Sequence, residues 1–145
     1  MARTIRDVEA YLVALGKPHD LVDVDTYSIR TGADTPPIGM RLAGDVLVLR
    51  VYIGEPPTLA GAEQAAFFRC LLEYNATELM HCAYGLEGGR VVLGAALELE
   101  NLDLNEFEAA VADIDLALAR HVPHLRELKA GKAQHAGAST LLRSR

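Results

Sequence analysis

The chain lacks tryptophan, has only 2 cysteines, and contains few aromatic residues, which make up 6% of its 145 positions. Two cysteines, Cys70 and Cys82, are too few for the disulfide framework of a small secreted domain, so we expect a cytoplasmic protein. Basic residues are also outnumbered: 14 Lys and Arg stand against 20 Asp and Glu, a formal net charge of -6. Because phosphate recognition needs clustered Lys and Arg, this balance argues against nucleic acid as a partner.

Long hydrophobic runs are missing as well. No apolar stretch reaches the roughly 18 residues that suggest a membrane-spanning helix, so we expect no membrane span. The N-terminal sequence MARTIRDVEA has no apolar segment of the secretory-signal kind, which again favours the cytoplasm. Hydrophobic residues nevertheless make up 50% of the chain, enough for one genuine core.

Charge is unevenly distributed along the chain. After Glu127 there are 4 basic residues and no acidic ones, among small and polar neighbours. Terminal segments of this composition tend to remain disordered. We therefore expect a single α+β domain over residues 1–128 and a disordered basic tail over residues 129–145, with no repeats and no second domain.

Two segments have the spacing of amphipathic helices with recognisable starts. Apolar residues fall on one face over residues 4–15, where Thr4 and Asp7 form a variant capping box. A later helix starts after the N-cap Asp103. Pro123 is expected to end or kink that later helix, because proline removes a backbone donor and crowds the preceding turn.

A further helix is predicted from Thr58 to about Tyr74. It is apolar on more than one side, so one side can face a sheet and the other a second subunit. Phe67, Leu71 and Tyr74 are therefore our candidates for a dimer interface, with a place in the core as the alternative for each. Burying a large side chain contributes about 1.5 to 3 kcal/mol, so several left in water would favour association.

Between the helices the pattern changes to alternation with a period of two. The segments 24–31, 38–42 and 46–53 precede the second helix, and the segments 80–86 and 90–99 follow it. Such alternation is typical of antiparallel strands. The predicted element order is therefore αβββαββα, an α+β fold in which helices pack on an antiparallel sheet.

One carboxylate pair has the spacing for chemistry. Asp23 and Asp25 lie two residues apart at the start of the predicted strand 24–31, hence on one face if the strand includes both, where paired carboxylates can do acid–base work. The interpretation we favour is a solvated strand edge that discourages aggregation. We accordingly expect no enzyme and no catalytic residue.

A zinc site is the other chemical possibility. His81, Cys82, His121 and His124 are the candidate ligands. Adjacent strand residues point to opposite faces, and Pro123 disturbs the spacing of the last pair. We expect surface histidines, no metal and no cofactor; the glycines of GLEGG are read as a turn.

The sequence LLEYNATELMHCAYGLEGGRVVLGAALELENLDLNEFEAAV carries a family resemblance. It has a helix ending in Leu-Leu-x-x-Asn, at Leu71, Leu72 and Asn75, then a Gly-rich turn before Arg-Val-Val-Leu, an alternating strand and a capped acidic helix. It resembles the type III secretion chaperones of the Tir-chaperone class and the related YbjN-type domains. The match extends over about Leu59 to Leu118.

The resemblance implies a non-catalytic homodimer that holds an extended segment of a partner protein. Leu12, Leu49 and Val51, on apolar faces of the first helix and of a strand, are our candidates for contacting the partner. The alternative is a YbjN-type structural or regulatory domain that has no secretion client.

Overall fold

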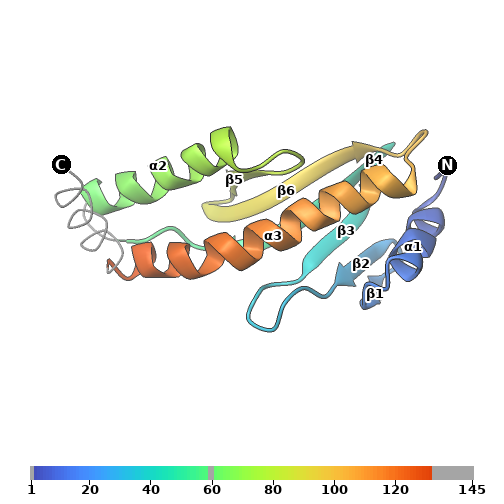
Figure 1. Cartoon of the computed structure of the whole chain (residues 1–145), viewed down its shortest axis with the longest axis horizontal. Coiled ribbons are helices and arrows are strands. Elements are labelled where there is room, and N and C mark those ends of the chain that lie inside the picture. The colour runs from blue at the N-terminus through green and yellow to red at the C-terminus, as the bar shows by residue number, and fades with distance from the viewer. Residues whose placement is uncertain (1, 59–60, 132–145) are drawn as a thin grey trace.

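A computed structural model describes residues 2–58 and 61–131 of the chain (Figure 1). Most of the predicted basic tail, residues 132–145, lies outside the described residues. The helices are α1 (Ile5–Ala14), α2 (Gly61–Thr77) and α3 (Leu104–Lys129). The strands are β1 (His19–Asp23), β2 (Thr26–Ile29), β3 (Ile38–Ala43), β4 (Val46–Gly54), β5 (Ala83–Glu87) and β6 (Arg90–Glu98).

The strands form one antiparallel sheet in the order β1-β2-β3-β4-β6-β5. The α+β class with helices on an antiparallel sheet is therefore confirmed. The predicted order lacks one strand, because β1 was not recognised. The predicted strand 24–31 is also too long: residues 24 and 25 form the turn between β1 and β2. β1 reads HDLVD, and almost all of it is exposed, so no alternation marks it in the sequence.

All three helices cover the same face of the sheet. The hydrophobic core joins residues of α1, α2 and α3 to the inward residues of β2, β3 and β4, such as Leu47 and Leu49, and contains no outward residue of these strands. The outward residues of β4, Val46, Val48 and Arg50, are only half-buried. In Figure 1, α3 crosses the sheet, with α1 beside the β1–β2 end and α2 beside β5. The opposite face therefore carries no helix among the described residues.

Local capping signals are confirmed at the helix starts. The Thr4 hydroxyl accepts from the Asp7 N–H at 3.3 Å, and the Asp7 carboxylate accepts from the Thr4 N–H at 2.9 Å. Asp103 accepts from the Glu106 N–H at 2.7 Å at the start of α3. These bonds involve residues three apart, so the sequence alone predicts them.

Pro123 was predicted to end or kink the last helix. It does not end the helix, because α3 continues to Lys129. Pro123 and the preceding-turn residue Ala119 are both exposed, so water can satisfy the carbonyl that proline leaves without a donor. Val122 and Leu125 on either side of Pro123 are buried and hold the helix to the core. Within the described ranges, no helix combines the length and the apolar character needed to span a bilayer.

Candidate protein-binding surfaces

The residues proposed to contact a partner lie in the core. Leu12, Leu49 and Val51 each have 0% of their surface exposed. In this conformation they offer no atom to another molecule, so the role expected of them needs correction. An apolar face in the sequence indicates burial but does not say whether the chain itself or a partner provides the cover.

The apolar surplus on α2 is smaller than predicted. Phe67 and Leu71 are 2% and 5% exposed, and they point into the chain's own core. Tyr74 is half-buried and stacks on His121 with ring centroids 3.6 Å apart. The large apolar side chain of α2 that faces solvent, among the described residues, is Leu72, which is 67% exposed. Leu72 belongs to the Leu-Leu-x-x-Asn pattern, but it was not among the candidates for a dimer interface.

One edge of the sheet, at β5, is capped at Tyr84 by a side chain of α2. The Asn75 Nδ2 donates to the Tyr84 carbonyl at 3.0 Å, and the Asn75 Oδ1 accepts from the Tyr84 N–H at 2.7 Å. The amide thus makes the same pair of hydrogen bonds that a residue of a neighbouring strand would make. Asn75 is the last residue of the Leu-Leu-x-x-Asn pattern, and this contact gives that pattern a structural reason.

A second contact fastens the segment that leads into β5. The Asp113 carboxylate of α3 accepts from the backbone N–H groups of Met80 and His81 at 3.1 and 2.8 Å, and from the Cys82 thiol at 3.2 Å. Partial burial works against ionisation, but these donors lower the pKa of Asp113 below its ordinary value. Burial and the hydrogen bond to Asp113 raise the pKa of Cys82, so the thiol stays neutral.

His121 lies behind this segment and is not a surface residue as expected. It is 3% exposed, and its Nδ1 lies 2.8 Å from the Tyr84 hydroxyl. Its Nε2 is 3.6 Å from the Glu78 carboxylate. Burial lowers the pKa of His121, and Glu78 only partly offsets this. Over residues 2–58 and 61–131, no three His, Cys, Asp or Glu side chains converge as a metal site would require.

The other edge of the sheet, at β1, is open. β1 pairs with β2 only. Leu21 and Val22 are 58% and 65% exposed, and Val24 in the following turn is 82% exposed. A strand edge with unpaired backbone groups and exposed apolar side chains is a template for pairing with another chain.

The carboxylate pair considered for acid–base chemistry is not assembled as predicted. Asp23 ends β1, and Asp25 lies in the turn, so the two do not share a strand face. The Asp23 Oδ1 accepts from the N–H of Val24 at 2.7 Å, a local turn contact. Both aspartates are exposed beside the open edge.

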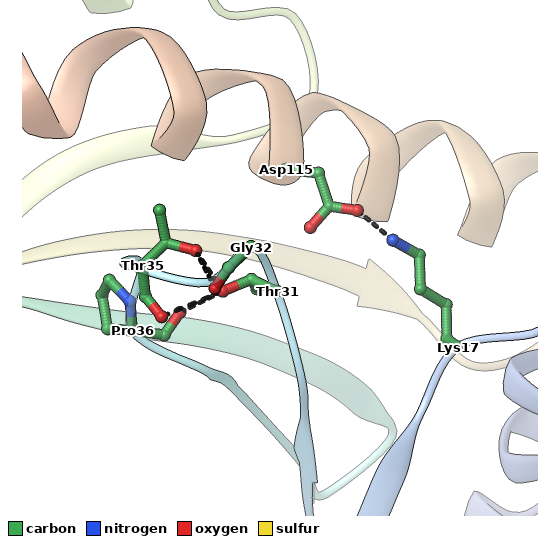
Figure 2. Close-up of polar contacts among 6 residues, drawn as sticks. All are labelled: Lys17, Thr31, Gly32, Thr35, Pro36 and Asp115. Carbon is green, nitrogen blue, oxygen red and sulfur yellow. Dashed lines mark hydrogen bonds and ion pairs between the residues drawn. The ribbon is translucent and has the colours of Figure 1, made fainter.

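A cleft of about 480 Å³ lies next to β1, between the α1–β1 connection, the β2–β3 loop and α3. Lys17 reaches across it and forms an ion pair with Asp115 of α3, as Figure 2 shows. Both side chains are 28% exposed. This ion pair joins the start of β1 to the long helix.

The far wall of the cleft is the loop after β2. The Thr31 hydroxyl donates to the Pro36 carbonyl at 2.8 Å, and the Thr35 hydroxyl donates to the Gly32 carbonyl at 3.0 Å (Figure 2). The loop therefore satisfies its own hydroxyl groups. Its hydrogen bonds hold the loop shape and leave little capacity for a ligand.

The described residues thus form a one-sided α+β sheet, with helices on one face and one open edge. The sequence matches the family model CesT_Tir_1 over residues 1–131. The chain therefore belongs to this family of type III chaperones. Among curated proteins, the comparison finds no match.

Solved structures support the fold assignment. A chain of the heterodimeric ExoU–SpcU complex from the type III secretion system of Pseudomonas aeruginosa is 18% identical, with a TM-score of 0.63 over 80% of this chain and 95% of that chain. YbjN from E. coli, a proposed transcription regulator, is 10% identical, with a TM-score of 0.61 over 86% and 95%. A chain of the HopA1–SchA chaperone–effector complex is 15% identical, with a TM-score of 0.54 over 85% and 94%. At these identities the likeness concerns the fold.

Proposed function

We propose that this protein is a cytoplasmic, non-catalytic chaperone that, as a homodimer, holds an extended segment of a partner protein. The observation that carries the proposal is the open, apolar β1 edge on a chain of the CesT_Tir_1 family. Two of the chains with the same fold come from complexes: the ExoU–SpcU heterodimer of a type III secretion system, and the HopA1–SchA chaperone–effector complex. The folded unit we assign to this role is the single domain of residues 1–128.

The β1 edge suits a partner that adds a strand. Main-chain hydrogen bonds along the edge supply affinity, and alternate side chains supply specificity. Leu21 and Val22 offer exposed apolar contacts to the added strand. The opposite edge offers no such site at Tyr84, because Asn75 already occupies its backbone groups.

Charge at this edge restricts the partner further. Asp20, Asp23 and Asp25 are exposed along and just beyond β1. Only Asp20 has a cationic neighbour among the described residues, Arg30 at 3.5 Å. We expect the segment that binds here to combine apolar residues with Lys or Arg, since like charges placed opposite one another destabilise strand pairing.

The test is co-expression with the products of neighbouring genes, followed by hydrogen exchange on any complex that copurifies. The expected result is slower exchange of β1 amides on binding. Leu21→Asp with Val22→Asp is expected to abolish the complex, and Leu86→Asp on β5, at 55% exposure, is the matched control. Protection confined to other elements, or binding that survives the β1 double variant, would contradict strand addition at β1.

The dimer is tested separately. We propose that the exposed side of α2 forms the dimer interface and that Leu72 is its main contact. The earlier candidates Phe67, Leu71 and Tyr74 lie on the core side of the same helix and hold it in place. Leu72→Glu is expected to give a monomer by light scattering, whereas Val13→Glu, at the same 67% exposure on α1, leaves the mass unchanged. If the unsubstituted protein is itself a monomer by light scattering, the proposed homodimer is wrong.

The second candidate is a YbjN-type structural or regulatory domain without a secretion client. The likeness to YbjN over 86% of this chain favours it. The two candidates differ in their partners. Copurification of a single extended client from the native host supports the chaperone, and failure with every neighbouring gene product supports the YbjN-type role.

A further inference from the structure

An apolar hollow of about 160 Å³ lies where α2 and α3 meet the end of β4 and the start of β6. The apolar residues that line it are Ile53, Phe67, Val91, Val122 and Leu125. Apolar cavities of about 150 Å³ in protein cores take up benzene, which is a larger group than the side chain of leucine. The hollow is therefore large enough for one leucine side chain.

The mouth of the hollow lies at the C-terminal end of α3. The exposed residues that line it are Arg126 and Lys129 of α3 and Glu55, which follows β4. In Figure 1, this end of α3 and the start of α2 lie at the same end of the molecule, away from α1. Because both signs of charge line the mouth, charge alone does not select what enters. Apolar contact has to hold an occupant.

The chain leaves the described part of the structure beside this mouth. Gly131, the last described residue, is two positions after Lys129. Among the residues that follow, 132–145, the only large apolar ones are Leu141 and Leu142. Ten residues of extended chain span about 33 Å. The segment from Gly131 to Leu141 is therefore long enough to fold back to the hollow.

Attachment to α3 favours these two leucines over apolar residues of other molecules. A short flexible linker holds a ligand near its site at an effective concentration on the order of millimolar. Closing the loop costs entropy that grows only slowly with loop length, and burying a leucine side chain offsets this cost. The two contributions are similar in size, so we expect the docking to be reversible.

We propose that the segment Leu141–Leu142 docks in this hollow, with one leucine side chain between Phe67 and Leu125. The anchor consists of these two residues only, so the disorder expected for the rest of the tail still stands. The hollow lies at β4 and β6, three strands away from β1 in the sheet order. The inference therefore goes beyond the proposed chaperone function and does not depend on strand addition.

The test is NMR spectroscopy of the methyl-labelled, full-length protein. We expect nuclear Overhauser effects between the methyl groups of Leu141 or Leu142 and the ring protons of Phe67. Leu141→Ser combined with Leu142→Ser is expected to abolish these effects and to shift the methyl resonances of Leu125. The methyl resonances of Val8, buried on α1, are expected to stay in place, which shows that the fold is intact.

Arg143→Gln combined with Arg145→Gln is the matched control, because it changes the same tail and keeps both leucines. It is expected to preserve the contacts to Phe67 at low and at high salt. Absence of these contacts in the full-length protein overturns the proposal, and so does their loss in the arginine variant, which would mean that charge holds the tail. Contacts of Phe67 with Leu59, or contacts between differently labelled copies of the chain in a mixed sample, would assign the hollow to another occupant and overturn the proposal as well.

Discussion

The two edge strands of the sheet, β5 and β1, have the same length of 5 residues but different surroundings. At β5, the Asn75 amide of α2 bonds both backbone groups of Tyr84, and Asp113 fastens the segment before the strand. At β1, no element lies beyond the strand among the described residues, and apolar side chains reach solvent.

This difference favours the β1 edge for the proposed strand addition. Backbone groups at an edge accept any strand unless something occupies them. Here a single side chain on a neighbouring helix does so at one edge. The β1 edge, in contrast, keeps unpaired backbone groups with which another strand can pair.

The largest expected effect comes from opening the β5 edge with Asn75→Ala. Both hydrogen bonds to Tyr84 are lost, so the free energy of unfolding is expected to fall by about 1 to 3 kcal/mol. Urea denaturation measures this change, and the Tyr84 amide is expected to exchange faster. Asn105→Ala, on an exposed site of α3, is the control; a loss of equal size there would remove the special role of Asn75.

A pH-dependent effect is expected at the same edge from His121. Its folded-state pKa lies below the ordinary 6.5, because the ring is buried against Tyr84 and Tyr74, and because Arg120 and His124 offset part of the attraction of Glu78. As pH falls through 6.5, the unfolded chain binds a proton at His121 that the folded protein does not bind. The free energy of unfolding therefore keeps its full value above pH 6.5 and decreases below it.

The measurement is urea denaturation at several pH values on both sides of that point. His121→Gln is expected to remove most of the decline, since glutamine does not titrate. His81→Gln, on an exposed histidine, is expected to leave it in place. An unchanged pH profile in His121→Gln would refute this explanation.

A smaller effect is expected on the β1 side from Asp115→Asn, which breaks the ion pair with Lys17. Both side chains are partly exposed, at 28%, so solvent screens the pair and the loss is expected to stay below about 1 kcal/mol. Thermal denaturation with and without added salt measures it. Glu73→Gln, in the exposed pair with Arg69, should cost less still, and the reverse order would count against the anchoring role of Lys17.

The smallest change in stability is expected at the open edge itself. Leu21→Ser and Val22→Ser remove side chains that are already exposed, so the free energy of unfolding should move by no more than about 0.5 kcal/mol. Circular dichroism with urea checks this. A larger loss would mean that β1 is held by these side chains and is not free to receive a partner strand.

Much of the fold was predictable because its signals are local. Capping at Thr4 and Asp103 and the alternation of β4 and β6 depend on residues within a few positions of one another. The family resemblance also rested on one continuous segment. β1 escaped prediction because an exposed edge strand has no apolar alternation, and the continuation of α3 past Pro123 depends on which side of the helix faces water.

The candidate contact residues could not be placed in the same way. Leu49, Val51 and Phe67 were recognised as apolar, but their burial depends on the packing of the helices against the sheet. The exposed counterparts, Leu21 and Leu72, have the same chemistry in the sequence. Only the arrangement of distant elements distinguishes the two groups.

The sequence by itself determined most of the element types, the starts of α1 and α3 and the family resemblance, because these depend on side chains near in the chain. The tertiary structure alone decided which edge is closed, that α2, α3, β4 and β6 meet around an apolar hollow, and that His121 is enclosed. Each of these features requires residues that are distant in the chain to meet, and such meetings depend on packing that no local pattern specifies.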